Sequence, residues 1–255
     1  MQFPDLLGRV VVVTGAGRSR GIGTAVCRAF ADQGCTIFFT TWPSYDREKY
    51  PDEAASAKQL AEELRLKGVP AAFMEADLAL PDCAERILDS VEESFGEPSI
   101  LVNNAAYSVK DGFEKLDALG LDAHYAVNIR GTALLSVEFA KRFSSKRGGR
   151  IIFLTSGQDL GPMPGELAYV ASKGAISAFT RSLASAIACK GITVNAVDPG
   201  PTDTGWMSED LRIRLAGQNA MGRVGRPEDA ASLIVFLASA AAEWISGEII
   251  HARGI

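Results

Sequence analysis

Residues 10–23 read Val10-Val11-Val12-Val13-Thr14-Gly15-Ala16-Gly17-Arg18-Ser19-Arg20-Gly21-Ile22-Gly23. The four valines predict a strand buried on both faces, the glycines predict a tight turn, and the Ala-rich segment that follows predicts a helix. Glycines let the backbone approach the phosphates of a dinucleotide, and the unpaired N–H groups at the start of a helix stabilise the phosphate charge. The stretch therefore predicts a strand, a pyrophosphate-binding turn and a helix in an α/β fold.

Beyond this stretch, short β-branched runs alternate with helical segments along the whole chain. This alternation is typical of repeated βαβ units, so we expect a Rossmann-type doubly wound parallel sheet of about seven strands flanked by helices. The expected strands are 9–14, 36–41, 71–75, 100–103, 150–155, 193–197 and 248–251, and the expected helices are 21–33, 53–67, 82–95, 128–143, 168–189 and 227–238. The stretches 42–52 and 199–225 fit neither pattern, and we expect both to be long functional loops.

The composition is that of a globular protein with a substantial core. The chain has 255 residues, 47% of them hydrophobic and 22% charged, and a net charge of −5, so we expect a single domain over residues 1–255 and no nucleic-acid partner. The beginning of the chain lacks a basic region followed by an apolar run, and no apolar segment approaches the roughly 20 residues that span a membrane. We therefore expect a cytoplasmic protein that does not bind a membrane.

The cysteines and histidines do not suggest a metal site. No two of the four cysteines form a Cys-x-x-Cys pair, and the two histidines stand alone in the sequence. These residues are Cys27, Cys35, Cys83, Cys189, His124 and His251. We expect reduced packing cysteines and structural or surface histidines.

The end of the second expected strand bears on the choice of dinucleotide. An acidic residue there would hydrogen-bond the adenosine 2′-hydroxyl and repel a 2′-phosphate, but residues 38–42 contain none. Arg18 and Arg20 bring two guanidinium groups to the glycine turn, and a guanidinium matches phosphate geometry. We therefore expect NADP(H) rather than NAD(H), unless both arginines are solvated.

Tyr169 and Lys173 lie one helical turn apart in an expected helix, on the same face. A free tyrosine titrates near pH 10, so at neutral pH it needs a neighbouring cation to act as an acid or base. We expect Lys173 to lower the pKa of Tyr169.

Further motifs occur in a fixed order along the chain. They are Asn103-Asn104-Ala105-Ala106, Asn128 at the start of an expected helix, Leu154-Thr155-Ser156-Gly157, and Pro199-Gly200-Pro201-Thr202-Asp203-Thr204. Together with Tyr169 and Lys173, this order strongly resembles the short-chain dehydrogenase/reductase family, most closely its 3-oxoacyl-carrier-protein-reductase-like members. The resemblance covers essentially the whole chain.

The resemblance implies a catalytic tetrad of Asn128, Ser156, Tyr169 and Lys173. Tyr169 would protonate the oxygen of a carbonyl that receives hydride, and Ser156 would hold the same oxygen. Lys173 would tune the tyrosine and bind the nicotinamide ribose, while Asn128 would seat a water that resupplies protons. Without the family context, Asn128 would be interpreted as a helix N-cap and Ser156 as a turn residue.

The resemblance also implies contacts with the cofactor and the substrate. The expected cofactor-binding residues are Gly15, Arg18, Arg20, Gly21, Ile22, Gly23, Thr41, Asp77, Leu78, Asn103, Ala105, Tyr169, Lys173, Pro199, Gly200, Thr202 and Thr204. The expected substrate contacts are Gln158, Met163, Trp206 and Met207. Arg20, directly before Gly21, matches the position that binds the 2′-phosphate in NADP-dependent relatives, which leaves Arg18 free to point toward solvent.

The chain departs from the family pattern in three places. The glycine turn has five residues, Ala16 to Arg20, where the family usually has three. The loop that begins at Trp42 is longer than usual, and its aromatic residues would stack on adenine or pack against another subunit. The usual Asn-Gly-Gly ending is replaced by Ala252-Arg253-Gly254-Ile255.

We expect an NADPH-dependent oxidoreductase that transfers hydride to a ketone carbonyl. Related enoyl reductases space their tyrosine and lysine seven residues apart, and Glu166 stands seven before Lys173, so carbonyl reduction is favoured. One candidate substrate is a 3-oxoacyl thioester on an acyl carrier protein, which the basic residues 141–150, together with Lys190, would contact. The alternatives are reduction of free small ketones, sugars or steroids, and an NADP-binding sensor without activity. Relatives are commonly homodimers or homotetramers.

Overall fold

The computed structural model describes residues 2–49 and 57–254. Its centre is a seven-stranded, fully parallel sheet with the strand order β3-β2-β1-β4-β5-β6-β7. The strands are β1 Val10–Val13, β2 Thr36–Thr41, β3 Ala71–Glu75, β4 Ile100–Asn103, β5 Gly149–Leu154, β6 Ile192–Asp198 and β7 Ile249–His251. The predicted doubly wound α/β fold is confirmed, and each expected strand lies within two residues of the observed one.

The chain adds β2 and β3 on one side of β1 and then returns to add β4 on its other side. Val11 of β1 pairs with Ile37 of β2 on one side and with Ile100 of β4 on the other. The connections that leave β1 and β4 therefore cross to opposite faces of the sheet and open a crevice at the carboxyl ends of these strands. The valine strand and its glycine turn border this crevice.

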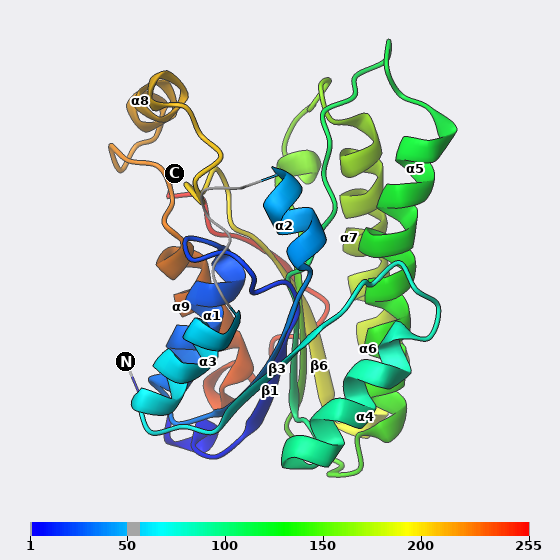
Figure 1. Ribbon diagram of the computed structural model, residues 1–255, viewed down its shortest axis with the longest axis vertical. Helices are drawn as coiled ribbons and strands as arrows, with labels where there is room; N and C mark the ends of the chain where they lie inside the picture. Colours follow the sequence, from blue (N-terminus) through cyan, green and yellow to red (C-terminus); the bar gives the residue numbers. More distant parts are fainter. Residues whose placement is uncertain (1, 50–56, 255) are drawn as a thin grey trace.

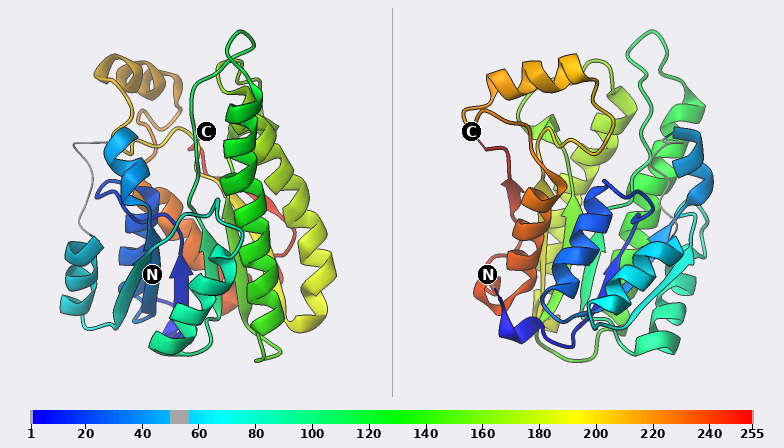
Figure 2. Two further views of the ribbon diagram at one scale, coloured as in Figure 1. Left: turned by 45° about the vertical axis from the view of Figure 1, so that its right-hand side comes forward. Right: turned by 60° about the vertical axis from the view of Figure 1, so that its left-hand side comes forward.

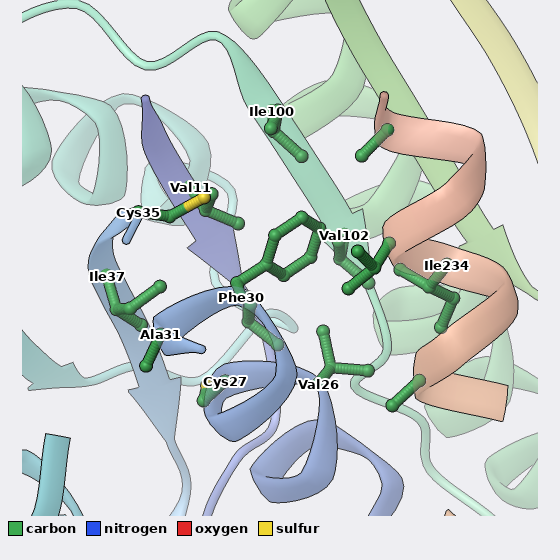
Figure 3. Packing of buried hydrophobic residues seen from close by; sticks show 14 of the residues in the cluster. Val11, Val26, Cys27, Phe30, Ala31, Cys35, Ile37, Ile100, Val102 and Ile234 are labelled. Atoms are coloured by element: carbon green, nitrogen blue, oxygen red, sulfur yellow. The ribbon is translucent and has the colours of Figure 1, made fainter. Parts of the chain in front are cut away.

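Three helices cover one face of the sheet, namely α1 (Ile22–Ala31), α3 (Ala57–Leu66) and α9 (Pro227–Ala238), as Figure 1 shows. Phe30 of α1 is fully buried and points toward Val11 and Val102 in the sheet (Figure 3). Ile234 of α9 belongs to the same cluster. The apolar stripes of these helices thus fix the glycine turn, which precedes α1, against the central strands.

The opposite face is covered by α4 (Cys83–Phe95), α6 (Thr132–Arg142) and α7 (Leu167–Ile187) (Figures 1 and 2). Phe139 of α6 and Ile176 of α7 are buried with Phe153 of β5 in a second apolar cluster. Because helices cover both faces of the sheet, side chains that point to either face are buried, and the strands are nearly continuous apolar runs.

The helix expected to begin at Asn128 begins ten residues earlier. Helix α5 (Ala118–His124) is capped by Asp117, whose side chain accepts a hydrogen bond from Gly120 N. It continues through a π-helical turn, Tyr125–Gly131, into α6. Asn128 therefore lies inside a continuous helix, and its expected place at a helix start was wrong because the cap is Asp117.

The two segments expected to be loops each contain a helix. Helix α2 (Pro43–Lys49) follows β2 directly, and α8 (Glu209–Gln218) starts at Ser208, whose side chain accepts from Leu211 N. Short 3₁₀ turns occur at Pro4–Leu6, Gly157–Asp159, Ala188–Lys190 and Ala240–Ala242. Residues 50–52 of the first expected loop and 53–56 of the helix expected at 53–67 lie outside the described residues. Among the helices described, none has the length and apolarity to cross a membrane.

Candidate active site

A cavity of about 940 Å³ lies at the carboxyl ends of the strands. Its lining comes from the segments at the ends of all seven strands, from the first two turns of α7 and from α8. The topology thus brings together residues from near both ends of the chain, from Gly15 to Arg253. Its size suits a ligand of dinucleotide class together with a small second molecule.

The glycine turn forms one wall of the cavity and has no room for side chains. Gly15 has a φ of +74°, and a Cβ there would lie 2.7 Å from Ala105 Cα. A Cβ on Gly23 would lie 2.6 Å from Asn104 Nδ2. That amide donates to Gly15 O at 2.9 Å, so Asn104 ties the turn to the end of β4.

Helix α1 points its N-terminus into the cavity, and its N-cap Gly21 offers no side chain to the first N–H groups. The glycine-lined turn and the uncapped helix end fit the pyrophosphate of a nicotinamide dinucleotide. Gly15, Gly21, Ile22 and Gly23 would hold it.

The two arginines of the turn differ in position. Arg18 lines the cavity and donates from Nη1 to Thr204 O at 3.2 Å. Arg20 does not line it and forms an ion pair with Asp203 at 3.1 Å. The two additional residues of the turn therefore move the cavity-facing guanidinium from position 20, where the family match puts it, to position 18.

A carboxylate that was not expected lies over the glycine turn. Asp46 of α2 lines the cavity, and a Cβ on Gly17 would lie 2.0 Å from its Oδ2. Burial raises the pKa of Asp46, and the charge of Arg18 acts in the opposite direction. Asp46 stands five residues beyond the end of β2, so a search for an acidic residue at the strand end missed it, and only helix α2 returns it to the turn.

The aromatic residues of the same segment stack within the protein. Trp42 and Tyr45 are parallel with ring centroids 5.6 Å apart. The hydroxyl of Tyr45 accepts a hydrogen bond from Ser108 N at 3.2 Å, and its ring packs against Tyr107. These aromatic contacts therefore hold α2 against the segment that follows β4.

Tyr169 and Lys173 lie on the first turns of α7 and line the cavity with Ser156. Asp111 caps this helix from the segment after β4, since its carboxylate accepts from Leu167 N at 2.7 Å and Ala168 N at 2.9 Å. This capping fixes the helix end that carries the tyrosine.

Lys173 is 4% exposed, and its Nζ donates to Leu154 O at 2.7 Å. The same Nζ lies 5.6 Å from the centroid of the Tyr169 ring. Burial lowers the pKa of Lys173 to about 8, so this ammonium loses its proton more easily than a solvated lysine.

Burial raises the pKa of Tyr169 well above its ordinary value, and the carboxylate of Glu166 raises it further. A hydrogen bond with Ser156 acts in the opposite direction without reversing the shift. Desolvation of the phenol dominates the net shift, and the expected lowering by Lys173 stays a prediction. Tyr169 is therefore a protonated phenol at neutral pH.

Asn128 is buried and does not line the cavity. Its Oδ1 accepts from Tyr107 N at 2.7 Å, while its Nδ2 donates to Tyr107 O at 2.9 Å and to Ser172 Oγ at 2.9 Å. Ser172 Oγ in turn donates to Tyr169 O at 2.7 Å. The amide of Asn128 thus connects the strand-end segment to the turn that carries Tyr169.

His124 lies one turn before Asn128 and is 1% exposed. Its ring packs edge-on against Tyr107, with centroids 5.0 Å apart, and lies 6.5 Å from the ring of Tyr169. Nδ1 is 2.7 Å from Gly120 O. The expectation of a structural histidine fits this packing. Within the described residues no cluster of three or more His, Cys, Asp or Glu side chains is arranged for a metal.

Some expected contacts point elsewhere. Asn103 is buried against Ser136, Asp77 accepts from Ala79 N, and Gln158 bonds Ser156 N and Ser177. These three and Met207 do not line the cavity. The expected residues that do line it, besides those already described, are Thr41, Leu78, Ala105, Met163, Pro199, Gly200, Thr202, Thr204 and Trp206.

Arg253 also lines the cavity and was not expected there. It follows β7, and its Nε donates to Asp198 Oδ2 at 2.7 Å. The only sequence signal was the unusual ending of the chain, which gave no position in space.

Comparisons with known proteins agree with this architecture. A family model described as "Enoyl-(Acyl carrier protein) reductase" matches residues 15–254. An uncharacterized oxidoreductase of Bacillus subtilis is 51% identical and covers 96% of both chains, and a 3-oxoacyl-[acyl-carrier-protein] reductase of Aquifex aeolicus is 32% identical over 98% of this chain and 97% of its own.

A solved structure extends the comparison to the fold. A short-chain dehydrogenase of Burkholderia cenocepacia, in complex with NADP, superposes with a TM-score of 0.87 at 30% identity and 98% coverage of both chains. The strand order, the glycine turn, the cavity and these matches lead to one conclusion: the chain belongs to the short-chain dehydrogenase/reductase family, whose members are NAD(P)-dependent oxidoreductases acting on CH–OH and C=O groups.

Proposed function

We propose that the protein is an NADPH-dependent reductase of free, compact ketones. The observation that carries this proposal is the protonated phenol of Tyr169 in a cavity that it shares with Ser156, Lys173 and the glycine turn. A protonated phenol is a general acid, and the reduction of a carbonyl needs one at the oxygen.

The residues of the cavity divide the chemistry between them. A bound nicotinamide nucleotide supplies hydride, and negative charge then develops on the carbonyl oxygen. Tyr169 donates its proton to this oxygen while the hydroxyl of Ser156 hydrogen-bonds it. Lys173, with a pKa of about 8, stabilises the phenolate that remains. Asn128 holds Tyr107 and Ser172 and acts as a positioning residue.

Carbonyl reduction is favoured over the alkene reduction that the name of the family model describes. Lys173 follows Tyr169 by four residues, and both lie on one face of α7 beside the cavity. Glu166, seven residues before the lysine, is a carboxylate in the place where the enoyl-reductase pattern requires a phenol.

Arg18 supports NADPH as the reductant. It is the arginine of the turn that lines the cavity, and it borders the same glycines that fit the pyrophosphate. A guanidinium there suits the 2′-phosphate. The related structure from Burkholderia cenocepacia contains NADP, which agrees with this assignment.

A carrier-bound 3-oxoacyl thioester is the second candidate substrate, since it suits the likeness to the Aquifex aeolicus reductase. The basic residues expected to contact a carrier protein are mostly occupied within the chain. Arg142 pairs with Asp89 at 2.7 Å and with Glu138 at 2.9 Å, Arg150 is buried, and Lys190 donates to Ala140 O. This internal pairing favours a free ketone.

The test is NADPH consumption with a panel of free ketones and with one 3-oxoacyl thioester presented on carrier protein and on a short thiol. We expect turnover of free ketones, with little gain from the carrier. Tyr169→Phe should lower kcat at least about 1,000-fold and leave the Kd for NADPH within about twofold.

Tyr125→Phe is the matched control, because Tyr125 is 51% exposed and does not line the cavity. It should retain wild-type rates. An active Tyr169→Phe variant, or a wild-type protein that turns over none of the ketones, would contradict the proposal. Strong preference for the carrier-bound thioester would favour the second candidate.

A further inference from the structure

We propose that Arg253 is the anion-binding group of the substrate site and holds a carboxylate of the ketone that is reduced. The inference deepens the proposed function and rests on it. It makes the substrate class a short oxo acid rather than a neutral ketone.

The position of Arg253 is the first step. Its guanidinium lies over Gly157, the residue after Ser156, since a Cβ on Gly157 would lie 1.9 Å from Nη2. A Cβ on Gly200 would lie 2.9 Å from Arg253 Cγ. Both glycines therefore leave space for this side chain. The guanidinium therefore borders the cavity beside the residue that follows Ser156.

The side chain is held at its inner edge. Nε donates to Asp198 Oδ2 at 2.7 Å, and Asp198 is 1% exposed at the end of β6. Asp198 also accepts from Gly200 N at 2.9 Å and contacts His251 Nδ1 at 2.8 Å. Asn219 Nδ2 donates to Arg253 O at 2.8 Å, which fixes the backbone. A guanidinium fixed in this way loses little conformational entropy when it binds an anion.

The outer edge of the guanidinium is available to a ligand. The hydrogen bonds of the described residues use Nε but not Nη1 or Nη2, and the side chain is 22% exposed at the cavity. Two parallel N–H groups match the two oxygens of a carboxylate. Because the guanidinium adjoins the residue after Ser156, only a few bonds separate such a carboxylate from a carbonyl held by Ser156 and Tyr169.

The apolar side chains of the cavity fit a short oxo acid. Met163, Trp206, Leu211 and Leu215 line it and would contact the alkyl part. Glu166 also lines it, at the start of α7, and its carboxylate would repel an anion there. Lys110 also lines the cavity, but Arg253 is the cation that lies against the residue after Ser156, so we place the carboxylate there.

The experiment compares each oxo acid with its uncharged methyl ester, for example acetoacetate with methyl acetoacetate and pyruvate with methyl pyruvate, under saturating NADPH. We expect the wild type to prefer the acid by at least about tenfold in kcat/KM. Arg253→Met should lose about 100-fold on the acid, mainly through KM, and change little on the ester. Arg253→Lys should retain part of the preference, since it keeps the positive charge but lacks the two parallel N–H groups of a guanidinium.

Arg86→Met is the matched control, because Arg86 is a half-exposed arginine on α4 outside the cavity. It should keep the preference of the wild type. A second readout uses wild-type protein alone: propanoate should compete with the ketone, and propanamide should not. This readout stands even if Arg253→Met fails to fold.

Three outcomes would overturn the inference while leaving the proposed function intact. They are equal use of acid and ester by the wild type, equal inhibition by propanoate and propanamide, and an Arg253→Met variant in which the KM for NADPH rises instead of that for the ketone. If no ketone is reduced, the proposed function fails, and the subsite is then decided by thermal shift: propanoate should stabilise the NADPH-bound wild type and not Arg253→Met.

Discussion

Tyr169 shows that the environment of a side chain, and not its spacing to a neighbour, sets its protonation. The sequence places a lysine one turn away, which argues for a lowered pKa. In the folded protein the pKa is raised, because desolvation of the phenol and the carboxylate of Glu166 outweigh the hydrogen bond with Ser156. A tyrosine that keeps its proton is in the form that donates to a carbonyl oxygen, but a raised pKa makes it a weak acid, so the proposed reduction needs Ser156 and Lys173 to stabilise the phenolate.

Lys173 makes the free energy of unfolding rise with pH, whereas a lysine that gains an acidic partner makes it fall. Burial lowers its folded-state pKa to about 8 from an ordinary value of 10.5. Between these two values the unfolded chain binds more protons, so stability rises with pH across this window. Below about pH 8, the buried charge costs the folded protein on the order of 3 kcal/mol.

Lys173→Met should therefore be inactive but more stable than the wild type at pH 7, by up to about 3 kcal/mol. The difference should shrink as the pH rises from 8 to 10.5. Urea unfolding at pH 7 and pH 10 measures it, with Lys58→Met, an exposed lysine on α3, as the control that should change little. A variant that is less stable than the wild type at pH 7 would refute the assigned cost.

At the scale of elements, the strands were predictable because each is an apolar run between turn residues, as in Thr36 to Thr41. The helix starts were less so. Asp117 caps α5 from within a segment of weak periodicity, and Asp111 caps α7 from 56 residues away. Contacts that depend on such long-range capping leave no local pattern in a sequence.

Helix α2 is the element with the clearest effect on the predicted cofactor site. It brings Asp46 to Gly17, next to the arginine that faces the cavity. The sequence showed that no carboxylate stands at the end of β2, but it did not show that a helix would bring a later carboxylate back to the glycine turn. The search for cofactor selectivity therefore found Arg18 and missed its acidic neighbour.

Asp46→Asn should strengthen NADPH binding about tenfold and affect NADH little, because it removes a negative charge near the 2′-phosphate. Protonation has the same effect as the substitution. Burial raises the pKa of Asp46 above its ordinary value of 3.8, so the wild type should gain NADPH selectivity as the pH falls toward that pKa, and the variant should not.

Fluorescence titration with both nucleotides at several pH values measures this change. Glu48→Gln, an exposed residue of the same helix, is the control for a general loss of negative charge. NADPH affinity that is equal in the wild type and Asp46→Asn at every pH would show that the carboxylate does not face the phosphate.

At the scale of the whole molecule, the cavity unites segments from both halves of the chain, from Gly15 to Arg253. The cavity residues that could be predicted belong to motifs that occur in a fixed order along the sequence. The rest depends on side-chain direction, as when Asn103 turns inward to Ser136 while Asn104 faces the glycine turn. Alternate residues of a strand end point to opposite sides, and no motif reports which one faces a ligand.

Because the cavity joins both halves, a dinucleotide should stabilise the entire fold. NADPH at 100 times its Kd should add about 2.7 kcal/mol to the free energy of unfolding, which corresponds to about 5 to 10 °C in Tm for a chain of this size. Differential scanning fluorimetry measures it. NADH at the same concentration should give a smaller shift, and Arg18→Met should reduce only the NADPH shift.

The π-helical turn Tyr125–Gly131 has a consequence for the tolerance of this helix to length changes. An α-helix advances about 100° per residue, and a π turn holds one residue more than an α turn. The π turn thus takes up its additional residue without changing the relative rotation of α5 and α6. One further inserted residue that continued the helix as a regular α-helix would instead rotate α5 and its His124 about 100° relative to α6. Insertions between His124 and Thr132 should therefore be excluded from any library that seeks active variants.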